Sequence, residues 1–453
     1  MKLDIKNKQI VVIGAGLSGL ALVRFFADRG ASVALSDLRT REQLTGLDSL
    51  EGLPVQFDLG EHDLALFEKA DVIAVSPGVP LDCPPLLKAA SCGVPLLGEI
   101  EIAAQEIDAP IIGVTGTNGK STTTSLIGEI LQAWGKKTFV GGNLGTPLIT
   151  GCAEDIDGAV VELSSFQLET IDQFHPAIGL LLNLSSDHLD RYPDLHSYYQ
   201  AKLRIFRNMT AADFAVLNGD DDEICRLSAT VKATKVWFSG RGRQVEGMVR
   251  SGDMLIWNWR GANLQFSLSE LQIAGEHNIE NAMAAMIPPL LQGCPAELAW
   301  RAVCAFRGLR HRMQQVRTLN GVRWYNDSKG TNVGSVQKSL AGLPCGVTLI
   351  AGGKDKGSDY RPLKPLLNEK VKNLLLIGEA AEKMAGELSG SCDIQLLGDL
   401  ASAVQKAYAV TDPGGTVLLS PACSSFDMFR NYQARGDEFE RLVLQLPQQG
   451  EVS

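Results

Sequence analysis

The feature that most constrains the fold of this chain is a pattern that occurs twice: an apolar run, a glycine-rich turn and an amphipathic stretch. Residues 9–13 (QIVVI) lead into GAGLSG at 14–19, and residues 109–114 lead into TGTNGKS at 115–121. A strand that passes through glycines into a helix exposes backbone N–H groups at the helix N-terminus, where they bind phosphate oxygens. The sequence therefore predicts two separate nucleotide-binding units of the α/β type.

The length and the final third of the chain predict a third unit. A chain of 453 residues is long enough for about three domains of roughly 150 residues each. Strand-like runs at 347–351, 373–377 and 416–419 alternate with helix-like stretches at 400–410 and 437–446. We therefore expect an α/β protein of three domains: a Rossmann-like domain at 1–98, a P-loop ATPase-type domain with a mostly parallel sheet at 99–307, and a Rossmann-like domain at 308–453.

One part of the central domain has a different pattern. Residues 240–269 alternate between apolar and polar side chains, which is typical of strands with one buried face. We expect this region to form a small antiparallel extension of the central sheet.

The second glycine turn is the strongest candidate site. It is a variant of the GxxxxGK[ST] phosphate loop, because Val114 stands where the first glycine is usual. Lys120 is predicted to reach the β- and γ-phosphates and Ser121 to supply a hydroxyl ligand for Mg²⁺. An ordinary turn with a solvated lysine is the alternative, and the strand, turn and helix context disfavours it. The residues expected to bind ATP here are Gly116, Thr117, Asn118, Gly119, Lys120, Ser121 and Thr122.

Two segments with acidic residues follow strand-like runs downstream of this loop. They are VELSSFQLE at 161–169 and NLSSDHLDR at 183–191. Parallel sheets bind ligands in the loops at their carboxyl ends, so Glu162 and His188 could converge with Lys120 on a metal-bound triphosphate. Taken alone, such residues more often cap a helix or form a turn. The preceding phosphate loop favours the interpretation as ligands.

The first glycine turn allows two interpretations. Gly14, Gly16 and Gly19, with Asp37 downstream, are typical of a dinucleotide-binding fingerprint and would suggest an NAD-dependent oxidoreductase. The same geometry suits any pyrophosphate at a helix N-terminus. An oxidoreductase would leave the loop around Lys120 unexplained.

Several segments in a fixed order resemble the Mur ligase family. They are TGTNGKSTT at 115–123, ELSSFQL at 162–168, DHLDR at 187–191, GEHNIENAMAA at 275–285 and GLRHR at 308–312. The resemblance spans nearly the whole chain. It implies an ATP-dependent, amide-bond-forming ligase of peptidoglycan precursor synthesis, and it implies that the N-terminal domain binds a UDP-linked substrate in place of NAD.

The C-terminal segments indicate which substrates to expect. NDSKGTN at 326–332 and SPACSSFD at 420–427 resemble the family member that adds D-glutamate, whereas the Asp-Asn-Pro-Arg segment of the diamino-acid-adding member is not found. The implied reaction activates the carboxylate of UDP-N-acetylmuramoyl-L-alanine as an acyl phosphate, which the amine of D-glutamate attacks. A folylpolyglutamate synthase shares the central pattern and remains an alternative, although it lacks an N-terminal domain of this kind.

The resemblance also implies roles for single residues outside the phosphate loop. Contacts to the UDP substrate are expected from Leu17, Ser18, Asp37, Arg39, Gly78 and Asn143. Further contacts to ATP are expected from Asn281, Arg312 and Asp327. The glutamate is expected to contact Lys329, Thr331, Lys356, Ser425 and Phe426. Without the flanking motifs, the two lysines would pass as ordinary surface residues and Gly78 as part of an ordinary turn.

The resemblance also implies a metal site. Two Mg²⁺ ions are expected, held by Ser121, Glu162, His188 and a carbamylated Lys202, whose added carboxylate would replace an ammonium by an anionic ligand. The catalytic residues expected are Lys120, His188 and Lys202. His188 could instead accept a proton from the amine, but metal ligation is the favoured role.

Charge and hydropathy limit the partners and the location. The net charge of −10 disfavours nucleic-acid binding. The first residues lack the apolar core of a signal peptide, and no run of about 18 apolar residues occurs, so a cytoplasmic protein without membrane insertion is expected. We also expect a monomer whose domains close over the substrates.

Overall fold

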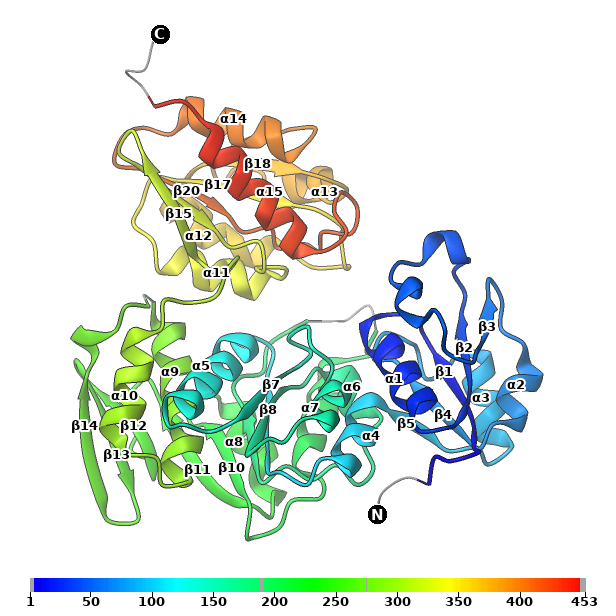
Figure 1. The fold of residues 1–453 in the computed structure, drawn as a ribbon. Helices are drawn as coiled ribbons and strands as arrows, with labels where there is room; N and C mark the ends of the chain where they lie inside the picture. Colours follow the sequence, from blue (N-terminus) through cyan, green and yellow to red (C-terminus); the bar gives the residue numbers. More distant parts are fainter. Residues whose placement is uncertain (1–3, 188–190, 274, 449–453) are drawn as a thin grey trace. The chain divides into compact units, whose positions relative to one another are not determined.

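The structure contains three β-sheets, each covered by helices (Figure 1). It is a computed structural model that describes residues 4–187, 191–273 and 275–448. The chain divides into two compact units. The first unit is Met1–Leu184, Tyr198–Leu271 and Glu280–Ala305, and it holds two of the sheets; the second is Ser185–Ser197, Gln272–Ile279 and Phe306–Ser453, and it holds the third.

The first sheet is parallel, with the strand order β3-β2-β1-β4-β5. This is the Rossmann-like arrangement predicted from the first glycine turn, and the order reverses beside β1, where that turn follows. Its strands are β1 (Gln9–Ile13), β2 (Ser32–Asp37), β3 (Val55–Leu59), β4 (Val72–Val75) and β5 (Leu96–Gly98). Its helices are α1 (Leu17–Asp28), α2 (Leu64–Lys69) and α3 (Pro84–Ser91).

The second sheet has the order β14-β13-β12-β11-β10-β9-β6-β8-β7. It is parallel from β7 to β12, and β13 and β14 are antiparallel, which confirms the extension predicted at 240–269. The strands are β6 (Ile111–Thr115), β7 (Thr138–Gly142), β8 (Gly158–Glu162), β9 (Ile178–Leu181), β10 (Phe214–Asn218), β11 (Thr234–Ser239), β12 (Gly247–Ser251), β13 (Met254–Trp259) and β14 (Ala262–Ser267). The helices are α4 (Glu99–Glu106), α5 (Lys120–Ala133), α6 (Ser165–Glu169), α7 (Leu195–Leu203), α8 (Asp222–Leu227), α9 (Glu276–Leu291) and α10 (Ala296–Ala305).

The third sheet has the order β15-β16-β20-β17-β18-β19, with only the pair β15 and β16 antiparallel among its described strands. The strands are β15 (Gln314–Leu319), β16 (Val322–Asn326), β17 (Val347–Gly352), β18 (Val371–Ile377), β19 (Asp393–Leu396) and β20 (Thr416–Leu419). The helices are α11 (Val333–Ala341), α12 (Lys364–Lys370), α13 (Ala381–Glu387), α14 (Leu400–Val410) and α15 (Tyr432–Gln445).

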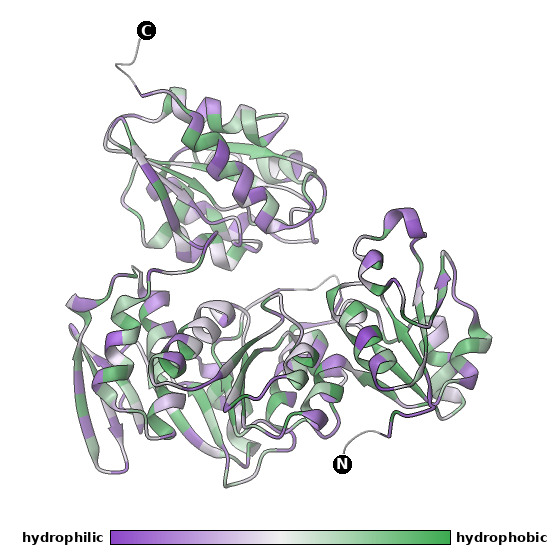
Figure 2. Ribbon diagram, in the orientation of Figure 1, coloured by the Kyte–Doolittle hydropathy of each residue, from purple (hydrophilic) through white to green (hydrophobic). Residues whose placement is uncertain are grey.

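The strands of the sheets carry the hydrophobic residues, and the helices carry hydrophilic residues on their outer faces (Figure 2). The central parallel strands are buried on both faces, as Val12 of β1, Val160 of β8 and Leu418 of β20 illustrate. None of the described helices is long and apolar enough to span a membrane.

Helix α4 follows β5 of the first sheet, and two of its buried carboxylates accept hydrogen bonds from backbone N–H groups in segments before β8 and β9 of the second sheet. The Glu101 carboxylate accepts hydrogen bonds from the backbone N–H groups of Asp172, Gln173 and Phe174 at 2.9 to 3.1 Å. Glu99 accepts one from the N–H of Ile149 at 2.7 Å through Oε1, while its buried Oε2 has no hydrogen-bond partner. Burial therefore raises the pKa of Glu99 to about 7, against the opposing effect of the backbone hydrogen bonds.

We predict that Glu99→Gln stabilises the protein more at pH 8 than at pH 5. The folded-state pKa lies above the ordinary value of 4.5, so Glu99 costs no stability below pH 4.5 and progressively more as the pH rises to about 7. Glutamine keeps the acceptor for Ile149, and the relative gain at pH 8 should be about 1 to 3 kcal/mol. Thermal unfolding at both pH values measures it. Glu106→Gln, at the partly exposed end of the same helix, is the control, and a pH-independent effect of Glu99→Gln would contradict the prediction.

Candidate active site

The turn between β6 and α5 requires glycine at two positions. Gly116 has a φ of 146° and Gly119 a φ of 85°, both in the region that side chains disfavour. A Cβ atom at Gly119 would lie 2.3 Å from Oδ1 of Asn281, and one at Gly116 would lie 3.0 Å from Cβ of Leu182. Asn281, a predicted ATP contact, is thus packed directly against the loop.

Asn183 holds this loop in place from the end of the neighbouring strand β9. Its side-chain oxygen accepts a hydrogen bond from the N–H of Asn118 at 2.8 Å, and its amide donates to the carbonyl of Asn118 at 3.0 Å. The N–H of Thr117 donates to the carbonyl of Asn183 at 3.0 Å. Asn183 lies in the motif at 183–191, but its role could not be predicted, because the contact joins segments far apart in the chain.

Two predicted catalytic lysines converge on one carbonyl oxygen of the loop. Nζ of Lys120 donates to the carbonyl oxygens of Gly116 and Thr117, both at 2.9 Å, and Nζ of Lys202 donates to that of Gly116 at 3.0 Å. Lys202 is only 1% exposed, and its Nζ lies 4.5 Å from the centre of the Tyr198 ring. Lys202 is therefore buried beside the phosphate loop.

Glu162 ends strand β8, the neighbour of β6, and its side chain is buried. Its Oε1 accepts a hydrogen bond from Nδ2 of Asn143 at 2.7 Å, so a predicted metal ligand and a predicted substrate contact touch one another. Ser121 and Thr122 are buried at the start of α5. His188 lies outside the described residues, and within the described ranges no group of three or more His, Cys, Asp or Glu side chains is placed to hold a metal.

All six residues predicted to contact the UDP substrate line one pocket in the first unit. Its volume is about 460 Å³, and its lining includes Leu17, Ser18, Asp37, Arg39, Gly78 and Asn143. The pocket combines apolar surface, such as the 70% exposed Leu17, with the glycine turn after β1. Their roles stay a prediction, but the structure brings the six together from four segments of the sequence.

Asp37 organises the polar side of this pocket. Its Oδ2 accepts a hydrogen bond from the N–H of Ala15 at 2.7 Å, and its carboxylate also accepts from the N–H and guanidinium of Arg39 at 2.7 to 2.9 Å. Burial opposes ionisation of Asp37, but these hydrogen bonds outweigh it and lower its pKa to about 2. Asp37 therefore stays ionised and fixes both the glycine turn and Arg39.

The remaining predicted ATP contacts lie in the second unit. Asp327 is buried at the end of β16, and its Oδ2 accepts hydrogen bonds from the hydroxyls of Ser339 at 2.8 Å and Ser420 at 2.7 Å. Burial raises its pKa to about 6, while the hydroxyl donors and the nearby Arg312 oppose the shift. Arg312 stands between two residues of positive φ, His311 at 62° and Met313 at 45°, which fix the backbone that presents it.

The predicted glutamate contacts lie in three loops that follow β16, β17 and β20, which are neighbours in the third sheet. Nζ of Lys329 lies 4.0 Å from the centre of the Tyr432 ring. Ser425 is buried, whereas Phe426 is 69% exposed. Tyr432 was not singled out from the sequence, because its contact with Lys329 depends on the packing of α15. Thr331 and Lys356 are partly exposed in the first two of these loops.

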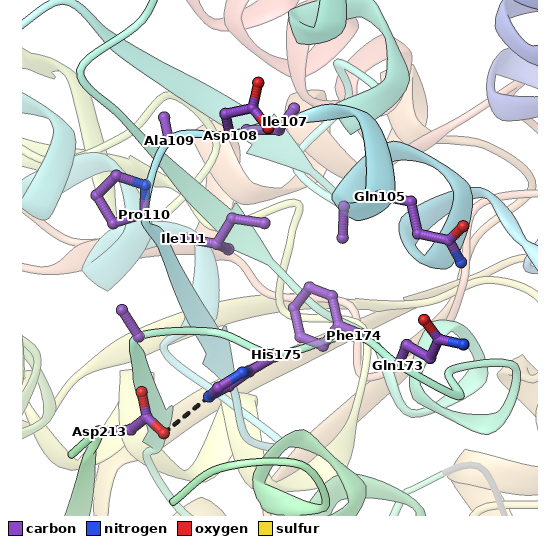
Figure 3. Close-up of a pocket in the computed structure, with 12 residues that line it drawn as sticks. Gln105, Ile107, Asp108, Ala109, Pro110, Ile111, Gln173, Phe174, His175 and Asp213 are labelled. Carbon is purple, nitrogen blue, oxygen red and sulfur yellow. Dashed lines mark hydrogen bonds and ion pairs between the residues drawn. The ribbon is translucent and has the colours of Figure 1, made fainter. Parts of the chain in front are cut away.

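A second cavity (Figure 3) lies at the amino ends of strands β6, β9 and β10, whereas the phosphate loop follows the carboxyl end of β6. Its volume is about 380 Å³, and Ile111 at the beginning of β6 and Phe174 before β9 line it. Nε2 of His175 contacts Oδ2 of Asp213 at 2.8 Å at its rim. Parallel sheets bind their substrates at the carboxyl ends of the strands, so this cavity is separate from the candidate active site.

The sheets and loops define a multidomain nucleotide-binding α/β protein. Known family models match each of its three parts: "Mur ligase MurD-like, N-terminal domain" at residues 8–98, "Mur ligase middle domain" at 114–288, and "Mur ligase, glutamate ligase domain" at 311–423. The chain belongs to the Mur ligase family. This confirms the predicted family and three-part α/β fold, and it removes the oxidoreductase alternative.

Full-length relatives share a single name. The protein from Syntrophotalea carbinolica is 54% identical over 99% of this chain and 100% of its own length. That from Geotalea uraniireducens is 48% identical over 98% of this chain and 99% of its own. Both are named UDP-N-acetylmuramoylalanine--D-glutamate ligase.

Solved structures agree with the fold at lower sequence identity. A pseudomurein peptide ligase type C from Methanothermus fervidus superposes with a TM-score of 0.62 at 20% identity, covering 97% of this chain and all of that chain. The UDP-N-acetylmuramate-alanine ligase of Thermotoga maritima gives a TM-score of 0.61 at 19% identity, covering 96% of this chain and 98% of that chain. At sequence identities of 20% and 19%, these similarities support the fold alone.

We predict that Gly119→Ala weakens ATP binding, whereas Gly135→Ala does not. Both glycines have a positive φ, 85° and 81°, but a Cβ atom meets Asn281 only at Gly119 and has open space at Gly135. Each substitution should cost about 1 kcal/mol of stability from backbone strain. Only Gly119→Ala should raise the Kd for ATP, by about tenfold or more. Calorimetric titration measures this, and equal Kd values for the two variants would show that the loop tolerates the change.

Proposed function

We propose that this chain joins D-glutamate to UDP-N-acetylmuramoyl-L-alanine at the expense of ATP, in the synthesis of peptidoglycan precursors. The observation that carries the proposal is the 54% identity over nearly the whole chain to a relative named for this reaction. The phosphate loop around Lys120 and the pocket around Asp37 support it, because the reaction needs separate sites for ATP and for a UDP-linked substrate.

The proposed chemistry proceeds in two steps. Hydroxide is a poor leaving group, so a carboxylate must be activated before an amine can displace one of its oxygens. A carboxylate oxygen of the L-alanyl group attacks the γ-phosphorus of ATP, forming an acyl phosphate and releasing ADP. The amine nitrogen of D-glutamate then attacks the acyl carbon and loses a proton. The C–O bond to phosphate breaks, and phosphate leaves with its electron pair.

The residues of the phosphate loop fit a bound triphosphate. Gly116 and Gly119 leave no Cβ in the way of phosphate oxygens, and the Lys120 ammonium lies over the loop, where it can move to a phosphate. Ser121 and Glu162 are the described residues that would hold Mg²⁺, because hydroxyl and carboxylate oxygens are its preferred ligands. Magnesium would neutralise charge on the transferred phosphoryl group. We propose two ions, with His188 among their ligands.

The carbamylation of Lys202 is a finer part of the proposal. Nζ of Lys202 donates to the Gly116 carbonyl and lies over the Tyr198 ring, so its amine stands beside the phosphate loop. Reaction of its amine with CO₂ would give a carbamate, an anion beside the phosphate loop. Such an anion would complete a set of oxygen ligands with Glu162 and Ser121.

The proposed function also assigns binding roles to residues outside the phosphate loop. We propose that the pocket of Leu17, Ser18, Asp37, Arg39, Gly78 and Asn143 binds the UDP substrate, that Asn281, Arg312 and Asp327 contact ATP, and that Lys329, Thr331, Lys356, Ser425 and Phe426 contact D-glutamate. Lysine cations suit the two carboxylates of free glutamate. We also propose a monomeric, cytoplasmic enzyme with domains at 1–98, 99–307 and 308–453.

The proposed reaction predicts that phosphate release requires one particular amino acid. With ATP, Mg²⁺ and UDP-N-acetylmuramoyl-L-alanine present, D-glutamate should support rapid phosphate release. L-Glutamate, L-alanine and diaminopimelate should leave the rate near background. A coupled phosphate assay measures all four. Release with another amino acid but not with D-glutamate would overturn the proposed specificity, and folate-dependent release would favour a folylpolyglutamate synthase.

The carbamate predicts a spectroscopic signal that depends on Lys202. In [¹³C]bicarbonate, the wild-type protein should show a carbamate carbonyl resonance by NMR, and Lys202→Arg should lack it. Turnover should fall by about 100-fold or more in Lys202→Arg, because a ligand of the metal is lost. Lys235→Arg, at a lysine in strand β11, should keep both signal and turnover. A wild-type spectrum without the resonance would refute the modification.

A further inference from the structure

Arg435 in helix α15 is a fully buried cation that the proposed reaction does not use directly. Its side chain has no exposed surface, and burial lowers its pKa to about 10, which leaves it charged at neutral pH. A buried guanidinium is tolerated only where its N–H groups find acceptors. The positions of those acceptors therefore indicate what Arg435 does.

The guanidinium binds two loops that are almost 100 residues apart in the sequence. Nε donates to Oγ of Ser328 at 3.0 Å, and Nη2 donates to the carbonyl oxygen of the same residue at 2.8 Å. Nη2 also donates to the carbonyl of Cys423 and Nη1 to that of Ser424, both at 3.2 Å. Ser328 directly precedes Lys329, and Ser424 directly precedes Ser425.

The third loop of the proposed glutamate site is attached to the same carbonyl. The N–H of Lys354 donates to the carbonyl of Ser424 at 3.0 Å, and the N–H of Ser424 donates back to the carbonyl of Lys354 at 3.3 Å. The backbone approaches so closely that a Cβ atom at Gly353 would lie 2.3 Å from the Ser424 oxygen and 3.1 Å from Nη1 of Arg435. Lys356 lies two residues after Lys354 in this loop.

We infer that Arg435 is a positioning residue for the amino-acid substrate, which it does not touch. It holds the loops after β16, β20 and β17 in one arrangement, so that Lys329, Ser425 and Lys356 face the two carboxylates of the incoming amino acid. This inference rests on the proposed glutamate site. The planar guanidinium is suited to the task because its donors point in fixed directions, whereas a lysine ammonium is a point charge that cannot span both loops.

A positioning role differs from a purely structural one in what its loss changes. If Arg435 only stabilised the domain, its removal would lower the unfolding temperature and the amount of active enzyme, with unchanged KM values. If it positions the three loops, its removal must weaken the binding of the amino acid selectively. The phosphate loop and the UDP pocket lie in the other compact unit and share no described contact with Arg435.

The test compares the full-length wild type with Arg435→Lys, Arg435→Ala and the control Arg441→Ala. Arg441 lies on the same helix but is exposed and bonds only to Glu438 and Gln445 among its described contacts. We expect the KM for D-glutamate to rise by about tenfold or more in both Arg435 variants, because charged hydrogen bonds to two loops are lost. The KM values for ATP and UDP-N-acetylmuramoyl-L-alanine should stay within about twofold, and Arg441→Ala should match the wild type. Added guanidinium should partly restore the D-glutamate KM of Arg435→Ala.

Each outcome of this experiment decides between the two ideas. Wild-type enzyme that does not use D-glutamate would refute the proposed function itself. Wild-type turnover together with an unchanged D-glutamate KM in folded Arg435→Lys, or a parallel rise of all three KM values, would refute the positioning role. If both Arg435 variants fail to fold, Ser328→Ala decides: it removes the Oγ acceptor of Nε and should raise the KM for D-glutamate several-fold, and an unchanged value would refute the inference.

Discussion

The carbonyl oxygen of Gly116 is the point on which the central site depends. It accepts hydrogen bonds from Lys120, at the start of α5, and from Lys202, on α7, so one backbone atom fixes both lysines beside the phosphate loop. Only a glycine can present its carbonyl at a φ of 146° in so close a turn. Asn183 then holds the other side of the loop from β9. The backbone conformation at Gly116 thus determines where the two lysine side chains lie in the site.

Several buried charged residues hold together segments that are far apart in the chain, and they differ in how completely they are hydrogen-bonded. Glu101 accepts several backbone N–H groups and is well satisfied, whereas its neighbour Glu99 has one oxygen without a hydrogen bond and a raised pKa. Asp327 is held by two hydroxyls, and Arg435 by carbonyl and hydroxyl oxygens. A buried ionised group that is fully hydrogen-bonded specifies the arrangement of its partners, because any other arrangement would leave it unpaired. These residues therefore determine loop positions more than they contribute net stability.

The sequence predicted the elements well where local patterns decide them. Strands β1 and β20 and helix α14 have the expected bounds, and the antiparallel extension from β12 to β14 follows from alternation. Helix α15 begins at Tyr432, five residues before the expected 437, because the side chain of Asn431 caps it by accepting from the N–H of Ala434. The first turns of α15 carry mostly polar residues, so apolar periodicity alone did not predict where the helix begins.

The six residues expected to contact the UDP substrate were named from the resemblance, and the structure brings them into one pocket. The contacts of Asn183, Tyr432 and Arg435 were not predicted, because each joins segments that are far apart in the sequence. In the third sheet, β20 lies between β16 and β17, so the loop after residue 419 is placed between the loops that follow residues 326 and 352. The guanidinium of Arg435 can therefore donate both to carbonyls of the loop after β20 and to the carbonyl of Ser328 in the loop after β16. The juxtaposition of these three loops therefore depends on strand order, which no single segment of the sequence encodes.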